Sequence, residues 1–220
     1  MKSAFPLGPE TDWQKTSTPD ILRPTRMSRL ARALALVGTI AVAVAAGLWS
    51  AHLALTSEDL FKPIRIGVWG AHPLAGTPEA DPYSAAIYAR TGRIPLANGE
   101  GVAFVASTDS SGELLSPACN YRIAGQTPTA RLWTLTSADR DGRLMPTPAG
   151  RVSLSSLGLL RASDGSFEVS ASRAPRPGNW LPLGTGESLS FILRLYDAPI
   201  TTGATLIGLA MPEITKVSCP

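Results

Sequence analysis

The side chains that would supply acid–base chemistry in this sequence are a few carboxylates spaced widely along the chain. Asp81, Glu100 and Asp109 are the candidate general acids and bases, and Arg131 or Arg194 would hold an anionic substrate. A carboxylate-dependent enzyme needs two carboxyl groups that converge in one pocket, and spacing along a chain does not show convergence. These residues support an enzymatic hypothesis without selecting a reaction.

The sequence contains few residues for catalysis by histidine or for binding a metal ion. His72 is the only histidine after residue 55, and its neighbours Ala71 and Pro73 supply neither a base nor an orienting carboxylate. The aspartates of the turn segments lack the dense D-x-D-x-D-G series with a closing glutamate that marks a calcium loop. We therefore expect no metal site and no cofactor, and we expect His72 to be an ordinary loop residue.

A second group of residues has the types that bind sugars and acidic ligands. Alternation along the segment ARLWTLT places Arg131 and Trp133 on one face of an expected strand, and Arg194 and Tyr196 share a face of another. If those faces meet, stacking and bidentate hydrogen bonds would hold a ligand. The alternative is that Trp133 belongs to the core and the arginines cap the edge of the sheet.

The segment GNWLP adds two candidate ligand-binding residues in an expected loop. Gly178 bends the chain, Asn179 is able to satisfy backbone groups of the loop, and Trp180 offers a large apolar face. The alternative interpretation is that Trp180 packs in the hydrophobic core. The two residues are predicted to lie just before the strand that begins at Leu189.

The elements that must position these residues are mostly strands. Alternating, β-branched and aromatic segments predict strands at 64–68, 102–108, 121–125, 130–137, 151–156, 166–172 and 189–197. Trp69 is expected to head a loop. Turn signals at 109–112, 139–142 and 164–165 separate consecutive strands, as Asp-Gly and Ser-Gly sequences do in hairpins. The pattern predicts an all-β, antiparallel sandwich.

One short soluble helix is predicted between Asp81 and Gly92. Asp81 is a good N-cap, Pro82 suits the first helical position, and Gly92 lies where a C-terminal cap belongs. Helical spacing predicts that Tyr83 and Ile87 pack on the sheet. Capping explains Asp81 without any chemistry, and a general acid is the alternative.

The run from Ala33 to Leu55 contains 23 residues and no Asp, Glu, Lys or Arg, which predicts a single transmembrane helix. Arginines crowd its N-terminal side, so the positive-inside rule puts residues 1–32, a disordered tail, in the cytoplasm. We expect residues 56–220 to form one periplasmic domain anchored to a bacterial inner membrane. A cleaved signal peptide is the alternative, because Ala43 and Ala45 form a small-x-small pattern. Met27 is an alternative start.

Charge and cysteine content set further limits. Six of the 20 basic and three of the 17 acidic residues precede Ala33, which leaves 14 of each after it and gives no reason to expect a nucleic-acid partner. Cys119 and Cys219 both follow the apolar run, and an even number in an oxidising compartment predicts a disulfide that closes a loop of about 100 residues. Two free thiols are the alternative.

Seven segments in order resemble the domain of unknown function 1214 family: DPYSAAIYARTG, EGVAFVASTDSSGELL, CNYRIAG, ARLWTLTSADRDG, GNWLP, LRLYDAP and MPEI. The similarity covers most of residues 66–219 and implies a jelly-roll-like β-sandwich. In many relatives this domain follows a domain of unknown function 1254, and the apolar run stands in that place here. The family has no established reaction, so the resemblance names a fold and leaves the activity open.

Two function hypotheses follow from the sequence. The first is a membrane-tethered periplasmic module that binds an envelope ligand or protein partner, or serves a structural role. It fits the anchor, the balanced charge and the lack of a nucleophile–base pair. The second is a carboxylate-dependent enzyme that acts on a small envelope-derived or sugar-like substrate. A concave site with a buried, paired carboxylate would favour the enzyme, and a flat apolar patch would favour the binding module.

Overall fold

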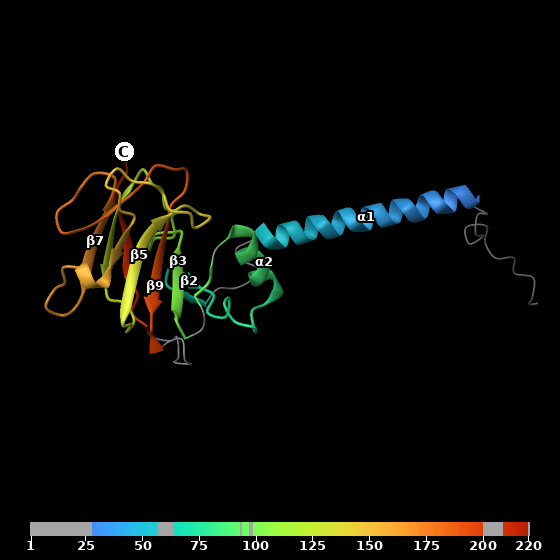
Figure 1. Ribbon diagram of the computed structural model, residues 1–220. Coiled ribbons are helices and arrows are strands. Elements are labelled where there is room, and N and C mark those ends of the chain that lie inside the picture. Colours follow the sequence, from blue (N-terminus) through green and yellow to red (C-terminus); the bar gives the residue numbers. More distant parts are fainter. Residues whose placement is uncertain (1–27, 57–63, 93, 97–98, 200–208, 220) are drawn as a thin grey trace, which may run out of the picture. The chain divides into compact units, whose positions relative to one another are not determined.

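The computed structural model describes residues 28–56, 64–92, 94–96, 99–199 and 209–219 (Figure 1). The chain divides into two compact units between Ala51 and His52. The expected cytoplasmic tail lies almost wholly outside the described residues, so its predicted disorder stays a prediction. The body after residue 63 is mostly β, as the sequence predicts.

The apolar run forms one long helix, α1 (Arg29–Thr56). Ser28 caps its start, because the Ser28 hydroxyl accepts a hydrogen bond of 3.1 Å from the amide of Ala31. The window that qualifies as a membrane span, Arg29–Ala54, has none of its residues buried inside the protein. Its length and composition suffice to cross a membrane, and an N-terminal signal sequence has the same properties.

The body consists of two sheets that form a sandwich (Figure 1). The first has six strands, in the order β1 (Ile64–Ile66), β2 (Trp69–Ala71), β3 (Gly101–Ala106), β9 (Ser190–Tyr196), β5 (Leu132–Ala138) and β6 (Ser153–Ser155). The second has four, in the order β10 (Glu213–Ser218), β4 (Asn120–Gly125), β7 (Phe167–Ser172) and β8 (Asn179–Pro182). A short 3-10 helix, η2 (Ser156–Gly158), follows β6.

The structure corrects the strand prediction in three places. Trp69 begins β2 instead of a loop, the GNWLP segment contains β8, and the C-terminal strand β10 has no counterpart in the sequence reading. Strands of three or four residues are too short to show alternation, and a proline as in Pro182 argues against a strand unless the strand is an edge. β8 is an edge strand that runs parallel to β7, so the sheets are not wholly antiparallel.

The two sheets pack through alternating apolar side chains. From the six-stranded sheet, Phe104, Leu135 and Leu193 are at most 1 % exposed, and Ile123 and Val169 of the four-stranded sheet are fully buried opposite them. Aromatic pairs join the layers, with the Tyr121 and Phe191 ring centroids 6.0 Å apart and those of Trp133 and Phe167 4.9 Å apart. Burial of each such side chain stabilises the fold by about 1.5–3 kcal/mol.

Hydrogen bonds tie the sheets together along both edges. On one edge, the Trp69 indole donates to the carbonyl of Pro212 at 2.8 Å, just before β10. On the other, the Arg151 guanidinium donates to the carbonyl of Trp180 at 2.8 Å, and the Ser137 hydroxyl donates to that of Pro182 at 3.2 Å. These bonds satisfy backbone carbonyls that the short strands leave unpaired.

The predicted helix is confirmed as α2 (Pro82–Thr91). Asp81 is its N-cap, accepting hydrogen bonds from the amides of Tyr83 at 3.0 Å and Ser84 at 2.9 Å, and Gly92 ends it with φ of 66°. Tyr83 does not pack on the sheet as predicted, since it is 45 % exposed, whereas Ser84 is buried. The side chain of Ile87 lies outside the described part.

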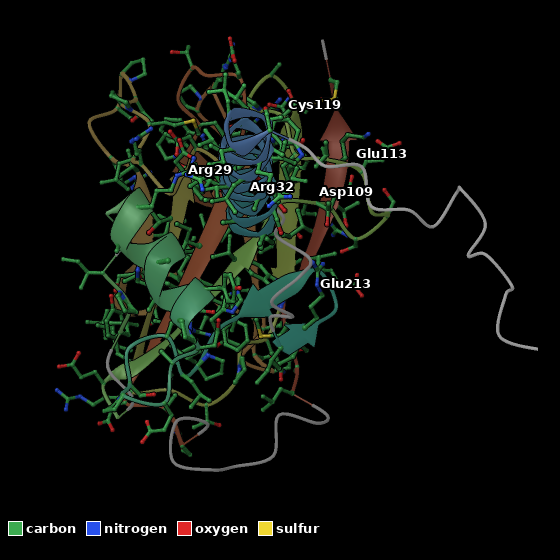
Figure 2. All side chains as sticks on the ribbon, turned by 90° about the vertical axis from the view of Figure 1, so that its right-hand side faces the viewer. Arg29, Arg32, Asp109, Glu113, Cys119 and Glu213 are labelled. Atoms are coloured by element: carbon green, nitrogen blue, oxygen red, sulfur yellow. A yellow bond between two sulfur atoms is a disulfide. The ribbon has the colours of Figure 1, made fainter. Side chains whose placement is uncertain are left out.

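A disulfide joins Cys119 to Cys219, as the sequence predicts. Cys119 immediately precedes β4 and Cys219 immediately follows β10, so the bond closes the ends of two paired strands across 100 residues of chain. Figure 2 shows Cys119 on the same edge of the sandwich as Asp109, Glu113 and Glu213. The end of β10 is thereby fixed to the start of β4.

Removal of the disulfide is expected to destabilise the body strongly. In the chain-entropy model, a closed loop of 100 residues contributes about 4–5 kcal/mol. We expect Cys219→Ser to lower the urea midpoint of the purified protein by the same amount as the double variant Cys119→Ser/Cys219→Ser. A reducing agent should lower the wild-type midpoint and leave both variants unchanged. Equal midpoints for wild type and variants would contradict this role.

Gly184 is expected to tolerate no side chain. A Cβ atom at this position would lie 2.6 Å from the Cβ of the buried Met145 and 2.8 Å from the carbonyl oxygen of Pro146. Gly184→Ala should therefore destabilise by about 1–3 kcal/mol, as overpacking does. Gly158→Ala is the matched control, because nothing lies within 4 Å of its Cβ position. Thermal unfolding should give a lower melting temperature for Gly184→Ala than for Gly158→Ala. Similar melting temperatures for the two variants would refute the close approach of Gly184 to Met145.

Candidate functional site

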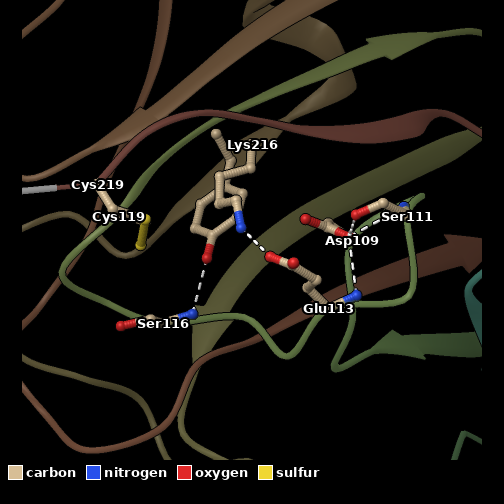
Figure 3. A network of polar contacts seen from close by, with 8 residues as sticks. Asp109, Ser111, Glu113, Ser116, Cys119, Lys216 and Cys219 are labelled. Atoms are coloured by element: carbon tan, nitrogen blue, oxygen red, sulfur yellow. Dashed lines mark hydrogen bonds and ion pairs between the residues drawn. A yellow bond between two sulfur atoms is a disulfide. The ribbon is translucent and has the colours of Figure 1, made fainter.

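Asp109 is the most buried of the candidate carboxylates, at 2 % exposure, whereas Asp81 and Glu100 are exposed. It opens the hairpin turn after β3, and its Oδ1 accepts hydrogen bonds from the Ser111 amide at 2.9 Å, the Ser111 hydroxyl at 2.6 Å and the Glu113 amide at 3.0 Å (Figure 3). The Ser111 hydroxyl is the main reason that the pKa of Asp109 lies below its ordinary value. A carboxylate held ionised by three donors stabilises the turn and is poorly suited to donate a proton.

The same turn is bound to the C-terminal strand β10. The Ser110 amide donates to the carbonyl of Ile214 at 2.8 Å, and the Ile214 amide donates back to the Ser110 hydroxyl at 3.0 Å. Lys216 of β10 forms an ion pair with Glu113 (Figure 3), and this contact raises the pKa of Lys216 above its ordinary value. The Asp109 carboxylate therefore belongs to a network that fastens two segments of backbone.

The structure does not bring the three candidate carboxylates together. Glu100 immediately precedes β3 and Asp109 lies beyond its other end, so the six residues of that strand separate them. Asp81 caps α2, and hydrogen bonds from Ser84 lower its pKa from the ordinary value. Within the described ranges, no group of three or more His, Cys, Asp or Glu side chains is placed to hold a metal ion.

The predicted arginine and aromatic cluster is also divided, because its members lie on opposite faces of the six-stranded sheet. Trp133 faces the core at 3 % exposure and pairs in register with the buried Leu195. Arg194 and Tyr196 flank Leu195 on β9, so they project from the outer face. Arg131 precedes β5 and pairs with Asp197 at 3.7 Å, where both side chains are exposed. The alternative stated for Trp133, a core position, is the one observed.

Asn179 and Trp180 have structural contacts in β8. The Asn179 Nδ2 donates to the carbonyls of Leu160 at 2.8 Å and Glu168 at 2.9 Å, and its Oδ1 accepts from the Leu160 amide at 2.8 Å. The Trp180 indole donates to the Ser172 carbonyl at 3.0 Å. Asn179 thus joins the loop after η2 to strand β7.

An open hollow of about 460 Å³ lies beside Asn179, on the four-stranded sheet. Its floor comes from the ends of β4 and β7, and its walls from the loops at 160–162 and 177–179. The polar residues that line it are Arg161, Ser166, Glu168, Ser170 and Asn179, and the Arg161 guanidinium lies over the Trp133 and Phe167 rings. Of the residues predicted from sequence, only Asn179 is among them.

Sequence reasoning missed Arg161, Glu168 and Ser170 for a physical reason. Glu168 and Ser170 alternate with buried residues in β7, which marks them as outward-facing without indicating what stands above them. Arg161 lies next to the hollow because it forms an isolated β-bridge with Phe167 across the turn at 162–165, and the sequence predicts this turn but no strand before it. The Asp164-Gly165 turn and the alternation of β7 were the usable signals.

Asp109→Asn is expected to destabilise the protein in a pH-dependent way. The folded pKa of Asp109 lies below its unfolded value of about 3.9, so its ionised form stabilises the fold above that pH, and this contribution is lost as the pH falls through the folded pKa. We expect a loss of about 1–3 kcal/mol at pH 7 and a smaller one near pH 3, from urea midpoints.

Asp164→Asn is the matched control for Asp109→Asn. Asp164 also accepts from a turn amide, that of Ser166 at 2.9 Å, but it lies in an exposed turn. Its substitution should shift the midpoint less at pH 7. A loss for Asp109→Asn that is as large at pH 3 as at pH 7 would show that the charge is not responsible.

Comparisons with known proteins place the centre of the chain in a family. Residues 100–200, which contain β3 to β9, match the family described as "Protein of unknown function (DUF1214)". No curated protein matches the chain. The crystal structure of the VPA0106 protein of Vibrio parahaemolyticus is similar, with a TM-score of 0.52 and 22% identity over 89% of this chain and 47% of that one.

A crystal structure of an uncharacterised protein from Burkholderia cenocepacia gives a TM-score of 0.41 and 18% identity, over 94% of this chain and 46% of that one. This chain therefore spans about half the length of either solved protein. At this level of identity, the likeness to the Vibrio protein shows the fold alone. The central part of the sandwich, residues 100–200, is a DUF1214 family domain.

Proposed function

We propose that this protein is a single-pass, membrane-anchored envelope protein whose β-sandwich lies in the periplasm and acts as a binding module. The observation that carries the proposal is the combination of α1 with a disulfide-closed body. The apolar side chains of α1 are exposed, and an exposed apolar helix of this length is stable in a bilayer and not in water. Disulfides persist outside the cytoplasm.

The orientation of the chain follows from charge. Arg29 and Arg32 lie in the first turn of α1, and its last turn contains no basic residue. The positive-inside rule then keeps the N-terminus in the cytoplasm and places the β-sandwich on the other side.

The contacts of the candidate carboxylates favour binding over catalysis. Asp81 and Asp109 each accept backbone amide hydrogen bonds that satisfy a helix end or a turn. Both pKa values are lowered, whereas a general acid near neutral pH needs a raised one. The hollow beside Asn179 offers a concave surface of the size that small ligands occupy.

Protease treatment of spheroplasts tests the topology. Protease added outside intact spheroplasts should digest the body of the membrane-bound protein, and an alkaline wash should not extract the protein beforehand. Val42→Arg/Val44→Arg should release it, because a charge at the centre of a span costs about 2.5–3.5 kcal/mol. Val42→Leu/Val44→Leu is the matched control and should stay bound.

Two outcomes of this experiment would contradict the proposal. Protection of the body until the spheroplasts are lysed would place it in the cytoplasm. An intact mass that corresponds to cleavage after Ala45 would identify a signal peptide and remove the anchor. A full-length mass with an accessible body supports the anchored form.

A further inference from the structure

We propose that the hollow on the outer face of the four-stranded sheet binds a neutral carbohydrate of about disaccharide size. This inference rests on the proposed function and names the ligand class of that module. It depends on the lining of the hollow, on the balance of charge around it and on the rigidity of its walls.

The hollow presents side chains that alternation turns away from the core. In β7, Phe167 and Val169 point into the core and are at most 4 % exposed. Because side chains alternate along a strand, Glu168 and Ser170 point outward. Ala124 pairs with Glu168 across the β4–β7 ladder and completes the floor. The floor therefore combines a carboxylate, a hydroxyl and a methyl group.

Polar groups in the hollow have hydrogen-bonding capacity left for a ligand. Among the described residues, the Ser170 hydroxyl makes no hydrogen bond. The Arg161 guanidinium is not one of these groups, because it lies over the Trp133 and Phe167 rings on the core side of β7 and bonds to the carbonyl of Gly165 at 2.9 Å. Glu168 pairs with Arg122 at 3.3 Å through Oε2, which leaves Oε1 as an acceptor. Mixed donors and acceptors of this kind match the hydroxyl groups of a sugar.

The charge around the hollow is balanced, which disfavours a charged ligand. Glu168 in the floor forms an ion pair with Arg122 of β4 at 3.3 Å on the same outer face, so the two charges offset each other. A free anion or cation would lose hydration and gain attraction from one set of charges while being repelled by the other. A neutral ligand with many hydroxyl groups avoids this cost.

Apolar groups provide the other half of the lining. Leu160, Ala162 and Pro177 contribute to the walls, and Leu160 is 70 % exposed. Pyranose rings have C–H faces that pack on such surfaces while their hydroxyl groups bond at the rim. The volume of about 460 Å³ lies within the range of small-ligand pockets.

The walls are fixed before any ligand arrives. The three hydrogen bonds of Asn179 hold the chain at Leu160 and Glu168, and the Arg161 guanidinium lies 5.7 Å from the ring centroids of both Trp133 and Phe167. A rigid wall reduces the entropy lost on binding. Asn179 is therefore a positioning residue, and its predicted role in ligand binding is indirect.

The test uses the full-length protein in a zwitterionic detergent, because glycoside detergents would compete as ligands. Cellobiose, maltose and N,N′-diacetylchitobiose are the neutral probes, and lactobionate is the anionic one, each titrated calorimetrically. We expect saturable binding of at least one neutral disaccharide and at least tenfold weaker binding of lactobionate. Ser170→Trp, which fills the hollow, should weaken binding at least tenfold. Ser153→Trp, at an exposed serine of β6, is the matched control.

Glu168→Gln covers the case in which Ser170→Trp fails to fold, because it keeps the side-chain shape and should still weaken binding severalfold. Absence of binding for all three neutral probes would overturn the proposal. Tighter binding of lactobionate, or unchanged binding by Glu168→Gln, would do the same. The spheroplast experiment is independent of these results, so an anchored periplasmic body that binds no disaccharide would refute the ligand class alone.

Discussion

The body depends on the attachment of its last strand, β10, to β4. Only Ile214 of the six residues of β10 is buried, so apolar burial contributes about 1.5–3 kcal/mol to holding the strand. That is small beside the entropy of ordering six residues, at about 1–2 kcal/mol each. The Cys119–Cys219 bond, the Ser110–Ile214 hydrogen bonds and the Lys216–Glu113 ion pair supply the remaining attachment.

This attachment also protects the interior of the four-stranded sheet. Without β10, the backbone groups of β4 would be an open edge, which in other proteins invites pairing with another chain. The turn at 109–113 in turn covers part of the open edge of β10, because Ser110 hydrogen-bonds the backbone amide and carbonyl of Ile214. Because β4 and β7 form the floor of the hollow, the proposed ligand site depends on a strand that does not line it.

Local chemistry made part of this structure predictable. The N-cap of Asp81, the turns at 109–112 and 139–142 and the Cys119–Cys219 pairing follow from residue types, and each is observed. Strand pairing was harder. Alternation correctly places Arg194 and Tyr196 on one face of β9, but it does not tell which face of β5 is adjacent, and the observed register puts Trp133 on the opposite side. The hollow could not be predicted for a related reason, because the sequence predicts no strand at Arg161 or at Asn179 and gives no sign that β8 pairs with β7 in parallel.

We propose that the anchored chain carries an exported, disulfide-closed body. The most direct measurement is to trap thiols in intact cells with a membrane-permeant alkylating reagent, and then to count the alkyl groups on the full-length protein in the membrane fraction by mass. We expect that neither Cys119 nor Cys219 is alkylated unless the cells are first treated with a reductant. Two alkyl groups on untreated, membrane-bound protein would contradict it, because the body would then be reduced in the cell.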